Sequence, residues 1–242
     1  QVDGTIRRDV HFPTSIKEMI FSGPHISTAN PYAKTPRRVC DLSSDYDVVD
    51  LTDIPSSFLP RTNYSIACSY NDYLSRVSDT SWGTKYISEY RLCTRKMLNQ
   101  DGERTLNSVI LPAGSAHING IFSMGFRRYL LSFSASAVSI PYDFYMKITK
   151  KANMNFSAIK GLPVFEEDAL QKEAICRLLM LNCVTSDFAA LWQNGYSPEF
   201  QSFTWSKDDS RLPNWMFTSL TQEWRPNNVL RSDYMRRQAL LE

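Results

Sequence analysis

The sequence predicts an α+β fold, with a mixed β-sheet domain and flanking helices over residues 1–165 and a mainly helical part over residues 166–242. Three observations lead to this prediction. Apolar residues make up 43% of the 242 residues, which is ordinary for a globular chain. Short runs with strand-like alternation are mixed with helical spacing up to residue 165. Helical patterns dominate after Gly161 and Pro163, which mark a break in the chain.

The first part opens with a helix signal and then mixes both kinds of element. Pro13 precedes Thr14 and Ser15, either of which can cap a helix start. Residues 46–51 alternate weakly, which predicts a strand. Residues 79–98 have helical spacing, which predicts a helix that ends at the turn 99–102.

Three hydrophobic runs follow. Residues 105–111 (TLNSVIL) are the best strand candidate. Residues 129–138 predict either a strand or a buried helix, because periodicity does not choose between them. Residues 140–148 alternate, which predicts a strand that ends in a lysine-rich turn.

The last part predicts two helices. Glu166, Glu167 and Asp168 would open the first, where acidic groups suit the positive end of the helix dipole. Apolar residues on nearly all faces then predict one long, buried helix over residues 169–192. Ser232 is a suitable N-cap for a final helix over residues 233–242. Because the chain lacks an initiating Met and ends within this helical pattern, we expect a piece of a longer protein.

The net charge hides a gradient along the chain. The total is only +2, which excludes a protein that coats nucleic acid through bulk charge alone. Residues 1–165 contain 19 Lys and Arg against 14 Asp and Glu, a balance of +5. Residues 166–242 contain 8 against 11, a balance of −3. One portion can therefore face an anionic partner while the other packs elsewhere.

The cysteines and the apolar runs indicate a cytoplasmic protein with no membrane partner. No apolar run approaches the roughly 18 residues of a membrane span. The five cysteines are odd in number, widely spaced and without a CxxC pair, which favours reduced thiols. They are Cys40, Cys68, Cys93, Cys176 and Cys183.

No motif in the chain points to a catalytic site. His11, His25 and His117 are not at metal-ligand spacing, and we expect most of them to be structural. No glycine-rich nucleotide loop or GxSxG elbow occurs. Whether the chain belongs to an enzyme therefore stays open at this point.

Asn30-Pro31-Tyr32 is similar to the Asn-Pro-Pro-Tyr loop with which adenine methyltransferases hold a flipped base. The second proline is missing, and no cofactor-binding strand precedes the site. An extended turn imposed by Pro31 is the better interpretation.

Basic residues beside tyrosines suggest contacts with a nucleic acid. Arg91 and Arg95 share a face of the predicted helix, with Tyr86 and Tyr90 interleaved. Such residues suit phosphate and groove contacts. The alternative is a solvated helix face with extended arginines. The candidate DNA contacts are Arg91, Arg95, Lys96, Arg104, Lys147, Lys150 and Lys151.

An ordered series of segments covers nearly the whole chain. The segments are 21–25 (FSGPH), 30–37 (NPYAKTPR), 46–52 (YDVVDLT), 54–55 (IP), 59–64 (LPRTNY), 102–106 (GERTL), 111–119 (LPAGSAHIN), 140–145 (IPYDFY), 181–183 (LNC) and 236–240 (RRQAL). The series resembles the region after the catalytic domain in bacterial type II (type IIG-like) restriction-modification adenine-specific DNA methylases. Residues 145–147, 159–164 and 169–175 also resemble the exit of a recognition domain in type I specificity subunits.

The resemblance implies a target-recognition module for double-stranded DNA, joined in the parent protein to a catalytic methylase domain. That domain would bind S-adenosylmethionine, and an endonuclease activity can accompany it in this family. This chain lacks the cofactor-binding and Asn-Pro-Pro-Tyr motifs, so methylation does not carry over and no cofactor is expected in it. A separate reader is physically needed, because a catalytic pocket contacts only the base that it extrudes.

Two alternatives remain. The chain could be a structural or protein-interaction segment that packs on the catalytic domain or on a partner subunit. Trp205, Trp215 and Trp224 motivate this, since clustered aromatic residues can mark an interface. An independent small methyltransferase is disfavoured by the absence of a cofactor loop.

Overall fold

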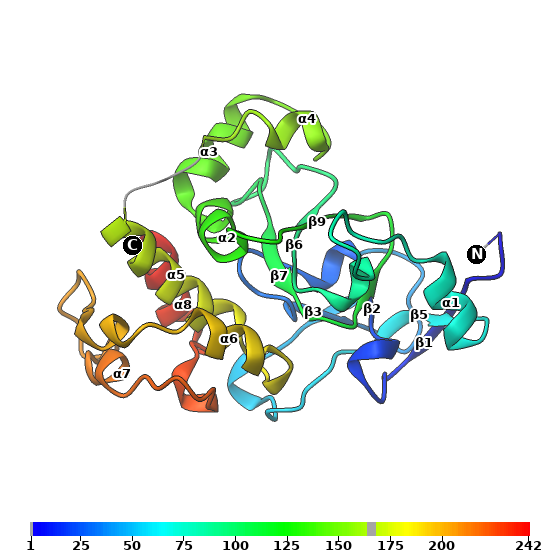
Figure 1. Ribbon diagram of the computed structural model, residues 1–242. Coiled ribbons are helices and arrows are strands. Elements are labelled where there is room, and N and C mark those ends of the chain that lie inside the picture. The colour runs from blue at the N-terminus through cyan, green and yellow to red at the C-terminus, as the bar shows by residue number, and fades with distance from the viewer. Residues whose placement is uncertain (1, 164–167) are drawn as a thin grey trace.

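The computed structural model describes residues 2–163 and 168–242 and confirms the α+β class (Figure 1). Within these residues every strand lies before residue 126, and most of the helical structure follows it. The strands are β1 (Ile6–His11), β2 (Ile20–Phe21), β3 (Lys34–Pro36), β4 (Tyr46–Val48), β5 (Thr62–Ile66), β6 (Arg91–Arg95), β7 (Ser108–Leu111), β8 (Ala116–His117) and β9 (Ile121–Gly125). The helices are α1 (Tyr70–Arg76), α2 (Leu130–Val138), α3 (Ile140–Ile148), α4 (Phe156–Ile159), α5 (Asp168–Asn182), α6 (Ala189–Gly195), α7 (Trp215–Thr218) and α8 (Asp233–Leu241).

The strands are divided among small sheets. β6 lies between β7 and β9 in a three-stranded antiparallel sheet, and β1 pairs with β5 and β3 with β4, both antiparallel. The short strands β2 and β8 are parallel, with Ile20 opposite Ala116. Leu92, Cys93 and Val109 have no exposed surface, so the three-stranded sheet lies in the interior.

The predicted helix over residues 79–98 is wrong. The chain makes a single 3₁₀ turn at Tyr86–Ser88 and then enters the central strand β6. Leu92 lies opposite Ile110 on one side and Met124 on the other. Pairing on both edges with burial on both faces outweighs the local helical spacing, which is a weak preference that tertiary contacts override.

The predicted strand over residues 140–148 is also wrong, because this segment is helix α3. Ser139 precedes it, and its Oγ accepts a hydrogen bond from the Tyr142 N–H at 3.4 Å. Pro141 lies in the first turn, where its missing N–H has no cost. Ser-x-Pro is a helix-start signal, and it outweighs the alternation of a short apolar run. The ambiguous segment over residues 129–138 is likewise a helix, α2.

The long helix predicted over residues 169–192 is broken in two. α5 ends at Asn182, whose side chain turns to the sheet. Its Oδ1 accepts from the Ile110 N–H at 2.8 Å, and its Nδ2 donates to the Ile110 carbonyl at 3.0 Å. The chain then passes through a 3₁₀ turn, Ser186–Phe188, before α6 begins.

Four other predictions fare better. The final helix is confirmed as α8, with Ser232 at its N-cap position. The strands over residues 46–51 and 105–111 are confirmed in shortened form as β4 and β7. The helix start near Ser15 is a single 3₁₀ turn, Ile16–Glu18.

The domain boundary at residue 165, with Glu166 and Glu167, lies outside the described residues.

One hydrophobic core extends across both predicted parts. It joins Phe21, Tyr32 and Ile110 from the first part to Leu179 and Trp192 from the second. α2 packs against α5 and β7, so the sheet and the C-terminal helices share a core. Among the described residues no helix is long and apolar enough to cross a bilayer. All five cysteines are free thiols, and four of them are buried.

A smaller cluster supports a lobe that we call the α3–α4 lobe, residues 139–163, which lies at the top of Figure 1. Met146, Met154 and Ala158 are its buried centre, and Leu98 and Leu106 reach into it from the loops around the central sheet. The backbone of residues 96–98 bonds to that of residues 152–154, with Met154 N–H donating to the Lys96 carbonyl at 2.7 Å. The lobe is therefore anchored to the sheet rather than loosely attached.

Candidate nucleic-acid interface

Arg91 is a buried structural residue. Strand alternation does place Arg91 and Arg95 on one face, as a helix would have done, but that face points inward. Arg91 is only 1% exposed, and its guanidinium donates to the Ser115 carbonyl and lies 5.7 Å from the centre of the Tyr86 ring. The expectation that Arg91 contacts DNA is therefore wrong.

Arg95 and Arg104 also direct their donors at the protein. Arg95 Nε donates to the Gly23 and Ile26 carbonyls at 3.1 and 2.9 Å, and its Nη2 donates to Ile26 at 2.6 Å. Arg104 Nη2 donates to the Val138 carbonyl. Burial lowers the pKa of both guanidinium groups. These two arginines fasten loops to the sheet and to α2.

The predicted lysines are placed differently, because most of them keep contact with solvent. Lys96 Nζ donates to Asn119 Oδ1 at 2.7 Å, and Lys147 Nζ donates to the Gly102 carbonyl at 3.1 Å. Lys151 Nζ has one long bond, 3.4 Å, to the Ser157 carbonyl. Lys150 is exposed, with a left-handed backbone (φ +51°) at the end of α3, and its side chain bonds to none of the described residues.

The turn from β9 to α2 carries basic residues that the sequence reasoning missed. Arg127 and Arg128 are exposed, and their side chains make no hydrogen bond or ion pair with the described residues. Tyr129 follows, 75% exposed and with φ +67°. The sequence does carry a signal for this turn. Two adjacent arginines and a tyrosine stand between two apolar runs, and such a charge pattern indicates an exposed basic turn.

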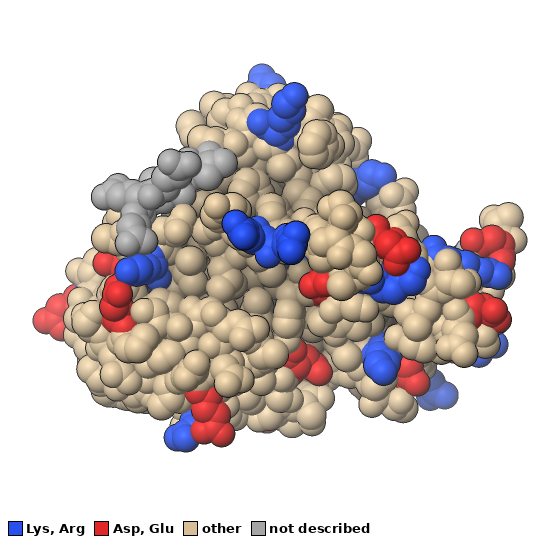
Figure 2. Space-filling model, viewed as in Figure 1, with Lys and Arg blue, Asp and Glu red and all other residues tan. Residues whose placement is uncertain are grey.

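These basic residues lie on the β9–α2 turn and on the α3–α4 lobe, and the exposed acids Asp101 and Glu103 flank Gly102, whose carbonyl accepts from Lys147 Nζ. Residues 105–163 contain six Lys and Arg and one acid, Asp143. Asp143 is 6% exposed, and its Oδ1 accepts the backbone N–H groups of Thr105 and Leu106 at 2.8 and 2.6 Å. Its charge is therefore directed inward. On the face shown in Figure 2 the α3–α4 lobe bears blue atoms and no red ones. We define the basic surface as Arg127, Arg128, Lys147, Lys150, Lys151 and Lys160.

Several basic residues in the first 90 residues are paired with acids instead. Arg8 and Arg37 lie 3.5 and 2.9 Å from the carboxylates of Asp41 and Asp47. Lys85 lies 3.0 Å from Asp79. Residues 1–90 contain nine Lys and Arg against eleven Asp and Glu, a balance of −2, so the +5 of the first part comes from residues 91–165. An anionic partner gains little from Arg8, Arg37 and Lys85, because each of these cations already faces a carboxylate.

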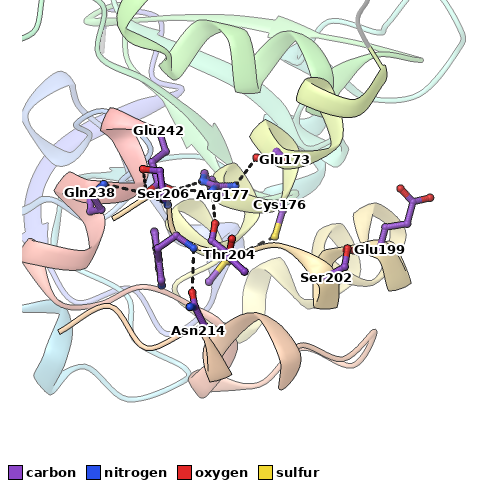
Figure 3. Close-up of polar contacts among 12 residues, drawn as sticks. Glu173, Cys176, Arg177, Glu199, Ser202, Thr204, Ser206, Asn214, Gln238 and Glu242 are labelled. Atoms are coloured by element: carbon purple, nitrogen blue, oxygen red, sulfur yellow. Dashed lines mark hydrogen bonds and ion pairs between the residues drawn. The ribbon is translucent and has the colours of Figure 1, made fainter. Parts of the chain in front are cut away.

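A second polar cluster lies where α5 meets the end of α8 (Figure 3). Arg177, whose side chain is 7% exposed, donates from Nε and Nη2 to the Glu242 carboxylate at 3.0 and 2.6 Å. Its Nη2 also donates to the Thr204 carbonyl at 3.1 Å, and Glu173 lies 3.5 Å from Nη1. A cavity of about 390 Å³ with mainly apolar walls lies beside it. Because the Arg177 donors are already taken by Glu242, Thr204 and Glu173, we interpret the cluster as a structural contact between α5 and the end of α8.

The described residues contain no arrangement that points to catalysis or to metal binding. No group of three His, Cys, Asp or Glu side chains within them could hold a metal ion. Burial raises the pKa of Cys93 and Cys176 to about 12, so both remain thiols at neutral pH and are poor nucleophiles.

Asn30-Pro31-Tyr32 is part of the core. Asn30 Oδ1 accepts the Tyr32 N–H at 3.0 Å, which makes the expected turn. Tyr32 has no exposed surface and stacks on Phe21, with 6.0 Å between ring centres. It is not placed to stack on a base.

The three C-terminal tryptophans do not form one patch. Trp205 is 5% exposed, and Trp224 Nε1 donates to the Cys183 carbonyl at 2.8 Å. Trp215 is 60% exposed. Two of the three are therefore engaged within the fold, and only Trp215 is available to a partner.

The segments of the ordered series meet in space. Arg104 and Asp143 join residues 102–106 to 140–145, and Asn182 joins 181–183 to the strand before 111–119. Arg236 donates to the carbonyls of Leu181 and Ala29, which joins the last segment to the first half. In comparisons with known proteins the chain matches no family model, no curated sequence and no solved structure.

Proposed function

We propose that this chain is a sequence-specific recognition module for double-stranded DNA from a restriction-modification DNA methylase. In this proposal it acts in the cytoplasm and positions a separate catalytic domain, which binds S-adenosylmethionine, on the target. The observation that carries the proposal is the basic surface, whose cations lack carboxylate partners among the described residues. The resemblance of the ordered series supports the choice of family.

The charge arrangement suits this role physically. Phosphate contacts set the position of a reader on the duplex, and a few polar side chains then reach the base edges. Such a reader needs a local positive face and not a high net charge. The basic surface comes from a turn and a lobe, and the backbone of the lobe is anchored beside the central sheet. An ordered backbone reduces the ordering cost of binding.

Binding can be tested with the 242-residue chain and a fluorescent duplex, by anisotropy at 50 to 300 mM salt. The logarithm of affinity should fall with the logarithm of salt by about 0.9 per phosphate contact. Arg127→Glu/Arg128→Glu should weaken binding by roughly tenfold or more. The control Arg225→Glu/Arg237→Glu changes the same number of exposed charges on the helical part, where Arg225 is paired with Glu223, and should bind like the wild type. No binding, or equal loss in both variants, would contradict the proposal.

Specificity needs a second measurement, since any basic surface binds DNA weakly. Selection from a library of random duplexes should enrich one sequence, and the selected duplex should bind at least tenfold more tightly than a scrambled one. An unenriched pool would argue against sequence reading.

Hydrogen exchange separates this proposal from a role in protein packing. With the selected duplex, protection should appear at residues 126–130 and 147–160. Protection confined to the region of Trp215 would favour the structural or protein-interaction role instead.

A further inference from the structure

Three aromatic side chains on the α3–α4 lobe are exposed, Phe144, Tyr145 and Phe156, and Phe156 is the most exposed of them. Phe156 is 74% exposed, the largest value among the phenylalanines of the described residues. Met154 before it and Ala158 after it are 1% and 2% exposed. The Asn155 side chain accepts the Ala158 N–H at 3.0 Å, which fixes the turn that presents the ring. Phe156 is thus a rigidly mounted apolar projection.

Cations flank this projection, and no acidic residue lies near it in the chain. Lys160 follows Phe156 by one helical turn and its N–H donates to the Phe156 carbonyl at 2.9 Å, so both residues lie on one side of α4. Lys151 Nζ reaches the Ser157 carbonyl at 3.4 Å, which brings a second ammonium group to the same short helix. Residues 144–163 contain four lysines and no Asp or Glu.

We propose that Phe156 inserts between stacked base pairs of duplex DNA while Lys151 and Lys160 contact the phosphates on either side. This inference rests on the proposed function and adds a residue that distorts the target. An apolar side chain inserted at a base step unstacks it and bends the duplex, and the cost is offset by the contacts that the bend permits. A duplex meets both requirements of the site, since it offers an apolar stack bordered by anionic phosphates.

A purely apolar protein surface would satisfy the ring and leave two ammonium groups desolvated. An anionic lipid surface offers both chemistries as well, so it forms an arm of the test. Phe144 provides an internal control, because it is 61% exposed on α3 of the same lobe.

The experiment uses the full chain and the selected duplex with 2-aminopurine placed at each position in turn. Insertion should raise 2-aminopurine fluorescence at one step, because unstacking relieves its quenching. Phe156→Ala should abolish this rise and weaken affinity by roughly tenfold, since stacking contributes about that much per base. The salt dependence should stay unchanged, because no phosphate contact is lost. Phe144→Ala should keep the rise, and in Phe156→Trp the new indole should be quenched by stacking.

The outcomes separate this inference from the proposed function. Salt-dependent binding with a fluorescence rise that persists in Phe156→Ala would overturn the inference alone. Absence of duplex binding by the wild-type chain would overturn both. Phe156-dependent binding to vesicles of one quarter phosphatidylserine, without a Phe156-dependent signal on the duplex, would assign the projection to a membrane and overturn the inference. Circular dichroism of each variant checks that the fold is retained.

Discussion

The interior arginines and the basic surface have the same charge and opposite surroundings. Arg91 and Arg236 are 1% and 6% exposed, and their donors point at backbone carbonyls from distant segments. Lys150 and Arg128 are exposed, and their side chains bond to none of the described residues. The first group holds the chain together, and the second is free for a partner. What a basic residue does is decided by what its donors meet, not by its neighbours in sequence.

Side-chain chemistry follows the same division. Arg91 and Arg236 carry a planar fork of five donors, which can satisfy several carbonyls at once. The basic surface is mainly lysine, a flexible point charge suited to phosphates at variable positions. The exceptions, Arg127 and Arg128, lie on a turn, and their side chains donate to no carbonyl of the described residues.

The largest expected effect is at Arg236. Its Nη1 donates to the carbonyls of Leu181 and Leu230, each at 2.7 Å, and Nη2 donates to Ala29 at 2.9 Å. Arg236→Met keeps the volume and leaves three carbonyls without these donors. We expect a loss of about 3 to 5 kcal/mol in the free energy of unfolding, measured in urea. Arg236→Lys should recover part of it. A loss of less than about 1 kcal/mol in the free energy of unfolding would mean that Arg236 stabilises the fold no more than a residue of the basic surface does.

His25 lies in the same interior, but its hydrogen bonds suit the neutral imidazole and not the charged one. Its Nδ1 accepts the Ser22 N–H at 2.9 Å and Nε2 lies 2.8 Å from the Arg61 carbonyl, which suits the neutral ring. Burial lowers the pKa of His25 to about 4 from the usual 6.5. Above pH 6.5 the ring is neutral in both states. Below it the unfolded chain binds a proton that the folded chain does not, so stability is lost as pH falls from 6.5 toward 4.

The His25 contribution is on the order of 3 kcal/mol across that range. His25→Gln removes the titrating group, so its stability should depend less steeply on pH between 4 and 6.5 than that of the wild type. Urea unfolding at several pH values measures both slopes. Parallel curves would show that His25 does not titrate differently on folding.

Asn182 tests a neutral tie of the same kind. Asn182→Leu removes both bonds to the Ile110 backbone, which is buried, and should cost about 2 kcal/mol. The loss should be smaller than at Arg236, because only two neutral groups lose a partner. Asn182→Asp is the informative control. It keeps an oxygen that accepts from the Ile110 N–H, but it places a second carboxylate oxygen against the Ile110 carbonyl, which repels it. A neutral outcome for Asn182→Leu would mean that α5 ends there for another reason.

The sequence predicted the fold class and the helical C-terminal part but not the middle of the chain. Composition is a property of the whole chain and it predicted the fold class, whereas the domain boundary at residue 165 lies outside the described residues and stays a prediction. The helix expected at residues 79–98 failed because β6 is a central strand, whose identity depends on β7 and β9 and not on its own spacing. For α3 the helix-start signal is present in Ser139 and Pro141, and it outweighs the alternation of the apolar residues that follow.

The candidate DNA contacts divide in the same way, into lysines that local composition identifies and arginines whose direction depends on the fold. Local composition identified Lys147, Lys150 and Lys151, which lie on the basic surface. It could not show that Arg91 and Arg95 point inward, because both helix and strand place residues four apart on one face. Nor could it show that the Asp143 charge is taken up by the Thr105 and Leu106 N–H groups, which is what leaves the surface positive.

The smallest expected effect distinguishes the basic surface most sharply from the interior. Lys150→Ser/Lys160→Ser removes two exposed charges whose side chains bond to none of the described residues, so the thermal midpoint should not change. The slope of log affinity against log salt should fall in magnitude by just under 2, since each phosphate contact contributes about 0.9. Arg225→Ser/Arg237→Ser should leave the slope as it is. Equal slopes in all three proteins would mean that these lysines contact no phosphate, and the basic surface would then be solvent-facing only. A reduced slope with an unchanged midpoint is a result that no interior arginine can produce, because those residues cannot lose a charge without loosening the fold.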